Sequence, residues 1–216
     1  MKKIGLAGLV LAGSMTAASA NTIHLTYLGP SHGFESINYS TLGISGIADG
    51  SHAGVAGEFQ LSSPELGSLV AYCVDLANTI SGNTSYTYEY DATLFTSDVV
   101  DNLDRLFTQH YADVVDSVTS AALQVLVWEM VYDTGALDLS SGAFVLNSGG
   151  AVATTASAWL SSLTNDSGDY NLVFLESDTD SQDLVTIDPV PVPAAGLLML
   201  AGLGAFGAVA GRRKTA

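Results

Sequence analysis

Basic residues are almost missing from the middle of this 216-residue chain. All 22 acidic residues fall between residues 21 and 189, where Arg105 is the only basic one, so this region carries a formal charge of about −21. A surface this acidic repels phosphate backbones and anionic lipid. The composition therefore predicts that nucleic acid is not a partner.

Cysteine is nearly absent too, since Cys73 stands alone. A single cysteine excludes an intramolecular disulfide, which leaves an inert buried thiol, an intermolecular disulfide or a reactive thiol. The histidines are scattered and form no motif for a cysteine hydrolase or a four-ligand zinc site. The acidic run over 177–183 lacks the glycine and final glutamate of a calcium loop. We expect neither a metal nor a cofactor.

The two ends of the chain are apolar and basic, unlike the middle. Residues 1–20 combine Lys2 and Lys3, a short apolar stretch and small residues before Asn21, which predicts a cleaved secretory signal peptide. Near the other end, residues 194–211 are uninterrupted small and apolar residues, just long enough to cross a bilayer. The basic tail (212–216) that follows predicts a cytoplasmic end and anchoring in the inner membrane.

The C-terminal segment (190–216) resembles the PEP-CTERM type of sorting signal in its Val-Pro-x-Pro-Ala variant. The resemblance rests on a five-residue box (190–194), the apolar span and the basic cluster, in that order; the matching residues are Val190, Pro191, Pro193, Ala194, Arg212 and Arg213. It implies an exosortase-type processing enzyme as a partner, in a Gram-negative bacterium that makes extracellular polysaccharide. An ordinary anchor helix would give the same topology without cleavage.

Residues 21–189 have the length of one domain. Alternating or continuous apolar runs predict strands over 22–28, 54–63, 68–77, 85–92, 170–177 and 183–187. Helical periodicity predicts helices over 98–109, with Ser97 as N-cap, over 113–132 and over 153–163. We expect an α+β domain in which antiparallel strands flank a central group of two or three helices.

Two apolar segments each hold one residue that apolar packing does not explain. Cys73 lies in a predicted strand, and Gln124 lies in the predicted helix over 113–132. Ser120, Gln124, Trp128 and Tyr132 recur at every fourth position and so share one helix face. A buried amide without partners costs about 1–3 kcal/mol, so we expect something to face Gln124, and the Cys73 strand is the obvious candidate.

These segments, "YCVD" and "LQVLVWE", resemble the paired boxes of bacterial thioester domains of surface adhesins. The resemblance implies that Cys73 supplies the thiol and Gln124 the acyl group of an internal thioester. Water must be excluded from such a bond, which suits Tyr72, Trp128 and Tyr132 as a shield. Asp75 or Glu129 would act as base when a nucleophile arrives.

Two functions follow from different classes. The first is a covalent adhesin on the cell surface or in the extracellular matrix, which captures amines or hydroxyls on a polymer. The second is a non-covalent structural component of the polysaccharide or biofilm matrix, in which Cys73 and Gln124 are ordinary core. Neither is an enzyme, because a thioester is consumed when it reacts. The absence of lysine from the exported region suits a protein with an amine-reactive group.

Overall fold

The computed structural model describes residues 22–187, except residues 83, 134 and 179–180. The predicted signal peptide and the whole predicted sorting signal, including its box, its transmembrane segment and its arginines, lie outside this part. Within the described part, no helix is both long and apolar enough to cross a membrane.

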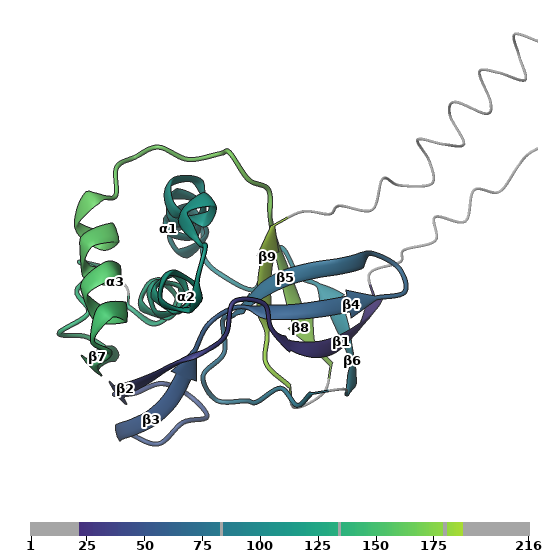
Figure 1. Cartoon of the computed structure of the whole chain (residues 1–216), viewed down its shortest axis with the longest axis horizontal. Helices are drawn as coiled ribbons and strands as arrows, with labels where there is room; N and C mark the ends of the chain where they lie inside the picture. Colours follow the sequence, from purple (N-terminus) through teal and green to yellow (C-terminus); the bar gives the residue numbers. More distant parts are fainter. Residues whose placement is uncertain (1–21, 83, 134, 179–180, 188–216) are drawn as a thin grey trace, which may run out of the picture.

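Six antiparallel strands close into a barrel (Figure 1). Around the barrel the order is β1 (Thr22–Pro30), β4 (Phe59–Ser63), β5 (Gly67–Cys73), β9 (Leu184–Ile187), β8 (Leu172–Ser177) and β6 (Ser85–Tyr90), which returns to β1. In β1, the buried side chains of Ile23, Leu25 and Tyr27 alternate with more exposed neighbours. This period of two places one face of the strand in the core.

A second sheet has three antiparallel strands, with β2 (Glu35–Thr41) between β3 (Gly50–Ala56) and β7 (Phe144–Ser148). The chain passes from this sheet into the barrel at Gly57 and Glu58, between β3 and β4. Gly57 has φ of +149°, and a Cβ there would lie 2.8 Å from the carbonyl oxygen of Gly33. Glycine is therefore required where the chain changes sheets.

Four helical segments lie beside the barrel: α1 (Ser97–His110), the 3₁₀ turn η1 (Tyr111–Asp113), α2 (Ser117–Tyr132) and α3 (Ala151–Ser162). Figure 1 shows α2 among the other helices and the strands, and every residue from Ser120 to Met130 is buried. A helix that is apolar all round is a core helix. Its first turn is fixed by a capping box, in which Asp116 Oδ1 accepts from Thr119 N (2.8 Å) and Thr119 Oγ1 accepts from Asp116 N (3.0 Å).

The structure confirms a mixed fold of antiparallel strands and three α-helices, and corrects its arrangement. The strands do not flank a central helix group, because six of them close into a barrel with the helices beside it. The strand predicted over 54–63 is two strands in different sheets, and β2 and β7 were not predicted. The helix predicted from residue 113 begins at Ser117, and Thr96, not Ser97, is the N-cap of α1.

The core position of α2 gives a first prediction. Leu123 is fully buried on α2, whereas Leu42 is 66% exposed. Leu123→Ala should lower the free energy of unfolding by about 2–5 kcal/mol, because it removes buried methyl groups and leaves a cavity. The matched substitution Leu42→Ala should change it by less than about 0.5 kcal/mol. Urea unfolding of residues 21–189 measures both, and similar losses would contradict the observed burial.

Candidate functional site

The side-chain amide of Gln124 is hydrogen-bonded to the backbone of Cys73 at both of its polar atoms. Cys73 N donates to Gln124 Oε1 (2.9 Å), and Gln124 Nε2 donates to Cys73 O (2.7 Å). Gln124 is 1% exposed and Cys73 is fully buried. The buried amide of the central helix is therefore satisfied by the very residue that carries the only thiol.

The backbone groups of Cys73 are free to bind Gln124 because β4 stops short. Phe59 pairs with Ala71, so continued pairing would place Gly57 opposite Cys73, but the chain turns away at that residue. On the other side, Val74 N donates to Asp183 O (2.9 Å). Backbone groups alternate in direction along a strand, so those of Cys73 point toward the gap. The amide of Gln124 occupies the place of the missing strand residue.

The helix face that carries Gln124 contacts β5 and its surroundings along its length. Ser120 Oγ accepts from Glu58 N (2.8 Å), one turn before Gln124. Two turns after Gln124, Tyr132 OH accepts from Leu76 N (2.9 Å) and donates to Val74 O (3.3 Å). The face predicted from the spacing of four therefore lies against the Cys73 strand and the segment after it.

The sulfur of Cys73 is a buried thiol. Sγ donates to Asp75 O (2.8 Å) and accepts from Asp75 N (3.3 Å). Burial raises the pKa of this thiol well above its ordinary value, and the contacts from the Asp75 backbone and the Trp128 indole only partly oppose that rise. The Trp128 Nε1–H itself has no partner at normal hydrogen-bond length within the described residues.

Aromatic rings surround the thiol. Trp128 lies 6.2 Å from Tyr39 and 5.9 Å from Phe144 between ring centroids. Burial raises the pKa values of Tyr39, Tyr88 and Tyr132, and the nearby Cys73 adds to each rise. The buried sulfur therefore lies near several aromatic side chains, and the shielding role expected of Trp128 and Tyr132 stays a prediction.

The other predicted support residues lie elsewhere. Tyr72 points to the opposite face of β5, where its hydroxyl donates to Glu58 Oε2 (2.9 Å), so it does not cover the sulfur. The carboxylate of Asp75 accepts from Ala77 N (2.7 Å) in the turn that ends β5, and only its backbone contacts the thiol. Glu129 Oε1 accepts from Asp138 N (2.6 Å), in the loop that follows α2. No described contact joins either carboxylate to Cys73 Sγ.

The histidines all have partners away from the thiol. His24 contacts Glu65, His32 contacts Glu58, His52 contacts Thr41, and His110 contacts Asp113. This arrangement does not support a cysteine–histidine hydrolase. Nor do any three His, Cys, Asp or Glu side chains within the described part come together as a metal site would require.

A pocket of about 180 Å³ leads to the amide of Gln124. Its lining is largely apolar and carries no charged side chain: Tyr27, Phe34, Val55, Gly57, Phe59, Thr79, Ile80, Gln124, Trp128 and Gln182. The volume is about that of six waters in the liquid, enough for a side chain or one small ring. Of the Cys73–Gln124 pair, Gln124 is the residue that lines this pocket.

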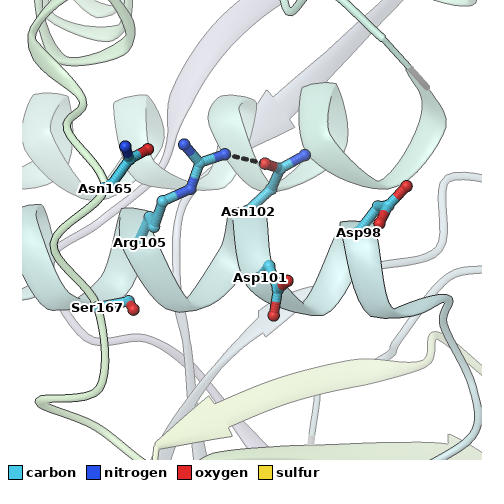
Figure 2. A pocket seen from close by; sticks show the side chains of 6 residues that line it. All are labelled: Asp98, Asp101, Asn102, Arg105, Asn165 and Ser167. Carbon is cyan, nitrogen blue, oxygen red and sulfur yellow. Dashed lines mark hydrogen bonds between the residues drawn. The ribbon is translucent and has the colours of Figure 1, made fainter.

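A wider depression of about 450 Å³ lies along α1 (Figure 2). Asp98, Asp101, Asn102, Arg105, Asn165 and Ser167 line it. Figure 2 shows Arg105 beside Asn102, to which it donates a hydrogen bond. This hollow is polar and holds no thiol, so it offers no acyl chemistry.

Sequence reasoning missed Gly57, Glu58 and the residues that line the pocket other than Gln124 and Trp128. The first two lie inside "GVAGEFQLSS", which has the period of one strand. The glycine followed by a glutamate in that run was the available signal that one strand ends and another begins there.

Residues 189–214 match the model of the PEP-CTERM protein-sorting motif. No curated protein matches the chain.

Two solved structures are similar in fold. One is the N-terminal thioester domain of a surface protein from Clostridium perfringens (14% identity, TM-score 0.42, 70% of this chain and 97% of that one). Another is the N-terminal thioester domain of fibronectin-binding protein SfbI from Streptococcus pyogenes (12% identity, TM-score 0.43, 74% of this chain and 96% of that one).

The chain carries a PEP-CTERM sorting motif. The match confirms the segment predicted over 190–216 and identifies an exported protein of a Gram-negative bacterium that is handled at the membrane. It implies processing by an exosortase-type enzyme.

Glu129 gives a prediction about pH. Burial raises its pKa to about 7; the Asp138 N–H opposes this rise, and repulsion by Asp133 and Asp138 adds to it. Between the ordinary pKa of 4.5 and about 7, the folded chain binds more protons than the unfolded chain, so stability should fall as pH rises through this window.

Glu129→Gln should remove this fall in stability with rising pH, because glutamine does not ionise. We expect it to stabilise the domain by about 1–2 kcal/mol at about pH 8 and to have little effect at about pH 5. Thermal unfolding across this range is the measurement, with the exposed Glu89→Gln as control. Equal effects of Glu129→Gln at both pH values would show that the Glu129 carboxylate does not titrate in this window.

Proposed function

We propose that residues 21–189 form an exported surface protein that captures a partner covalently through an internal thioester between Cys73 and Gln124. The pairing of the Gln124 amide with the Cys73 backbone is the observation that carries the proposal. Two hydrogen bonds of 2.9 and 2.7 Å hold the acyl group against the residue that bears the nucleophile. Such positioning removes much of the activation barrier of an intramolecular reaction.

Formation of the thioester is a balanced exchange of one bond for another. Cys73 Sγ attacks the side-chain carbonyl carbon of Gln124, the C–S bond forms, the C–N bond breaks, and the thiol proton leaves with the nitrogen as ammonia. The thiol must first turn away from Asp75 O, to which it donates in the structure. Rotation about a single side-chain bond provides that movement.

The N–H of Cys73 supports this step. It donates to Gln124 Oε1, the atom on which negative charge develops when sulfur attacks. A fixed donor aimed at a developing oxyanion in a dry site is a strong stabilising element. The same donor would act again when a nucleophile attacks the thioester.

Capture reverses the bond changes at sulfur. An amine or hydroxyl of the partner attacks the thioester carbon, a C–N or C–O bond forms, the C–S bond breaks, and the nucleophile's proton returns to sulfur. Each chain reacts once, because the Gln124 acyl group is then bound to the partner, so the protein is not a turnover enzyme. The exported region contains no lysine, so it has no side-chain amine of its own that could consume the bond.

The sorting motif supports a proposal for where capture takes place. We propose that the apolar C-terminal segment holds the protein in the inner membrane until an exosortase-type enzyme processes it. The domain then reaches the cell surface or the extracellular matrix. A polysaccharide or other surface polymer that bears amines or hydroxyls is the proposed partner.

A non-covalent structural role in the matrix is the second candidate. One observation favours it: the two hydrogen bonds to Cys73 satisfy both polar atoms of Gln124 without any reaction. In this case the acidic surface, not the Cys73–Gln124 pair, would bind the matrix.

The mass of the purified domain separates the two candidates. Under non-reducing conditions, the measured mass of residues 21–189 should be one ammonia below the mass calculated from the sequence. Cys73→Ala and Gln124→Ala should each have the full calculated mass. Gln182→Ala is the matched control, because Gln182 lines the same pocket and its side-chain amide donates to the Asp75 carbonyl (3.4 Å). It should keep the lower mass.

Addition of methylamine to the wild-type domain should then raise the mass by one methylamine and release a titratable thiol. A wild-type domain of full mass, with a thiol that titrates after unfolding, would rule out the covalent function and leave the structural one.

A further inference from the structure

Glu58 joins the three structural elements that surround the Cys73–Gln124 pair. It is 2% exposed. Its Oε2 accepts from Tyr72 OH (2.9 Å), its Oε1 contacts His32 Nδ1, and its backbone N donates to Ser120 Oγ (2.8 Å). The hydrogen bonds of this buried carboxylate hold its side chain in one position.

Each partner of Glu58 lies next to a part of the candidate site. Tyr72 precedes Cys73 on β5, and Ser120 lies one helical turn before Gln124 on α2. His32 lies in the connection between β1 and β2 that also contains Phe34, a wall of the pocket at Gln124. Glu58 therefore links three elements: β5, which carries Cys73; α2, which carries Gln124; and the connection that contributes Phe34 to the pocket.

Glu58 also lies at the break that admits Gln124. It follows Gly57, the residue that would otherwise pair with Cys73. A Cβ at Gly57 would lie 2.9 Å from Phe34 Cδ1, so the connection between β1 and β2 packs tightly on the break. The contacts of Glu58 therefore lie at the point where the pairing of β4 with β5 ends.

We propose that Glu58 is a positioning residue for the Cys73–Gln124 pair, which sets the distance between β5 and α2 at which the thiol and the amide meet. This role rests on the proposed thioester function. Glu58 does not touch either reacting group; it acts through Tyr72 and Ser120.

The charges around Glu58 fit a carboxylate that holds its neighbours by accepting hydrogen bonds. His32 is the one basic side chain that contacts it in the described part of the chain. Burial first, and then the charge of Glu58, raises the pKa values of Tyr72 and Tyr111, so both hydroxyls keep their protons. Asp116 is the acidic group near His32. Hydrogen bonds to a charged acceptor are stronger than those between neutral groups.

The experiment compares how fast variants of residues 21–189 lose ammonia after refolding, followed by intact mass. Glu58→Ala should slow this loss by at least about tenfold, because a small misplacement of reacting groups strongly slows an intramolecular reaction. Glu58→Gln keeps an oxygen for Tyr72 but loses the charge, and should slow it about threefold. A positioning role requires this order, in which Glu58→Gln slows the loss of ammonia less than Glu58→Ala does.

Two controls separate positioning from loss of stability. Glu35 also accepts from a hydroxyl of α2, Ser117 Oγ (2.5 Å), but a turn further from Gln124. Val152 is buried on α3, away from the pair. Glu35→Ala, Glu35→Gln and Val152→Ala should form the thioester at the wild-type rate even where they lower the melting temperature as much as the Glu58 variants. Rates for Glu58→Ala and Glu58→Gln equal to those of these controls would overturn the proposal.

A second readout distinguishes failure of the positioning role from failure of the thioester. If the wild-type domain never loses ammonia, the proposed function is wrong, and hydrogen exchange at Gln124 Nε2 then tests Glu58 alone. In a wild-type domain with an intact amide these protons should be protected. Glu58→Ala should speed their exchange at least about tenfold, as expected for local opening, and Glu35→Ala should not. Equal exchange in both variants would overturn the positioning role.

Discussion

The hydrogen-bond pair between the Gln124 amide and the Cys73 backbone is the constraint on which this structure depends. Without it, a buried amide and two buried backbone groups would lack partners, at about 1–3 kcal/mol each. β4 must stop before Gly57 for the pair to form, and the face of α2 must lie against the end of β5. The junction between the two sheets and the orientation of the central helix are therefore both needed for these two hydrogen bonds.

The same geometry serves packing and chemistry, and the two make different demands. Burial raises the pKa of the Cys73 thiol and so opposes formation of the thiolate. Burial also excludes the water that would hydrolyse a thioester. In the proposed reaction, proximity and the donor N–H of Cys73 would offset the first effect, and the burial of Cys73 would exclude water. A more exposed thiol would ionise more easily but would protect its product less well.

Local patterns in the sequence were sufficient for most elements and for the two residues of the site. The fourfold spacing from Ser120 to Tyr132 placed Gln124 on the correct helix face, because helix periodicity is local. Closure of the barrel was not predictable, since it depends on pairings such as β1 with β6 and β5 with β9 that no local pattern encodes. Glu58 was missed because its role comes from contacts with Tyr72, Ser120 and His32, which are distant in the sequence.

The composition is consistent with a single-use reactive group. A protein that carries an acyl donor must avoid nucleophiles of its own, and lysine is the side chain most apt to attack it. The exported region has none, and its charge of about −21 comes from carboxylates. Those carboxylates keep the chain soluble, and a negative field concentrates cations, including protonated amines, around the domain. The pocket at Gln124 has no charged side chain in its lining, so it offers no counter-charge to a protonated amine, and the neutral amine is the nucleophilic form. In the proposed capture, the acidic surface would attract the amine and the uncharged pocket would favour its reactive form.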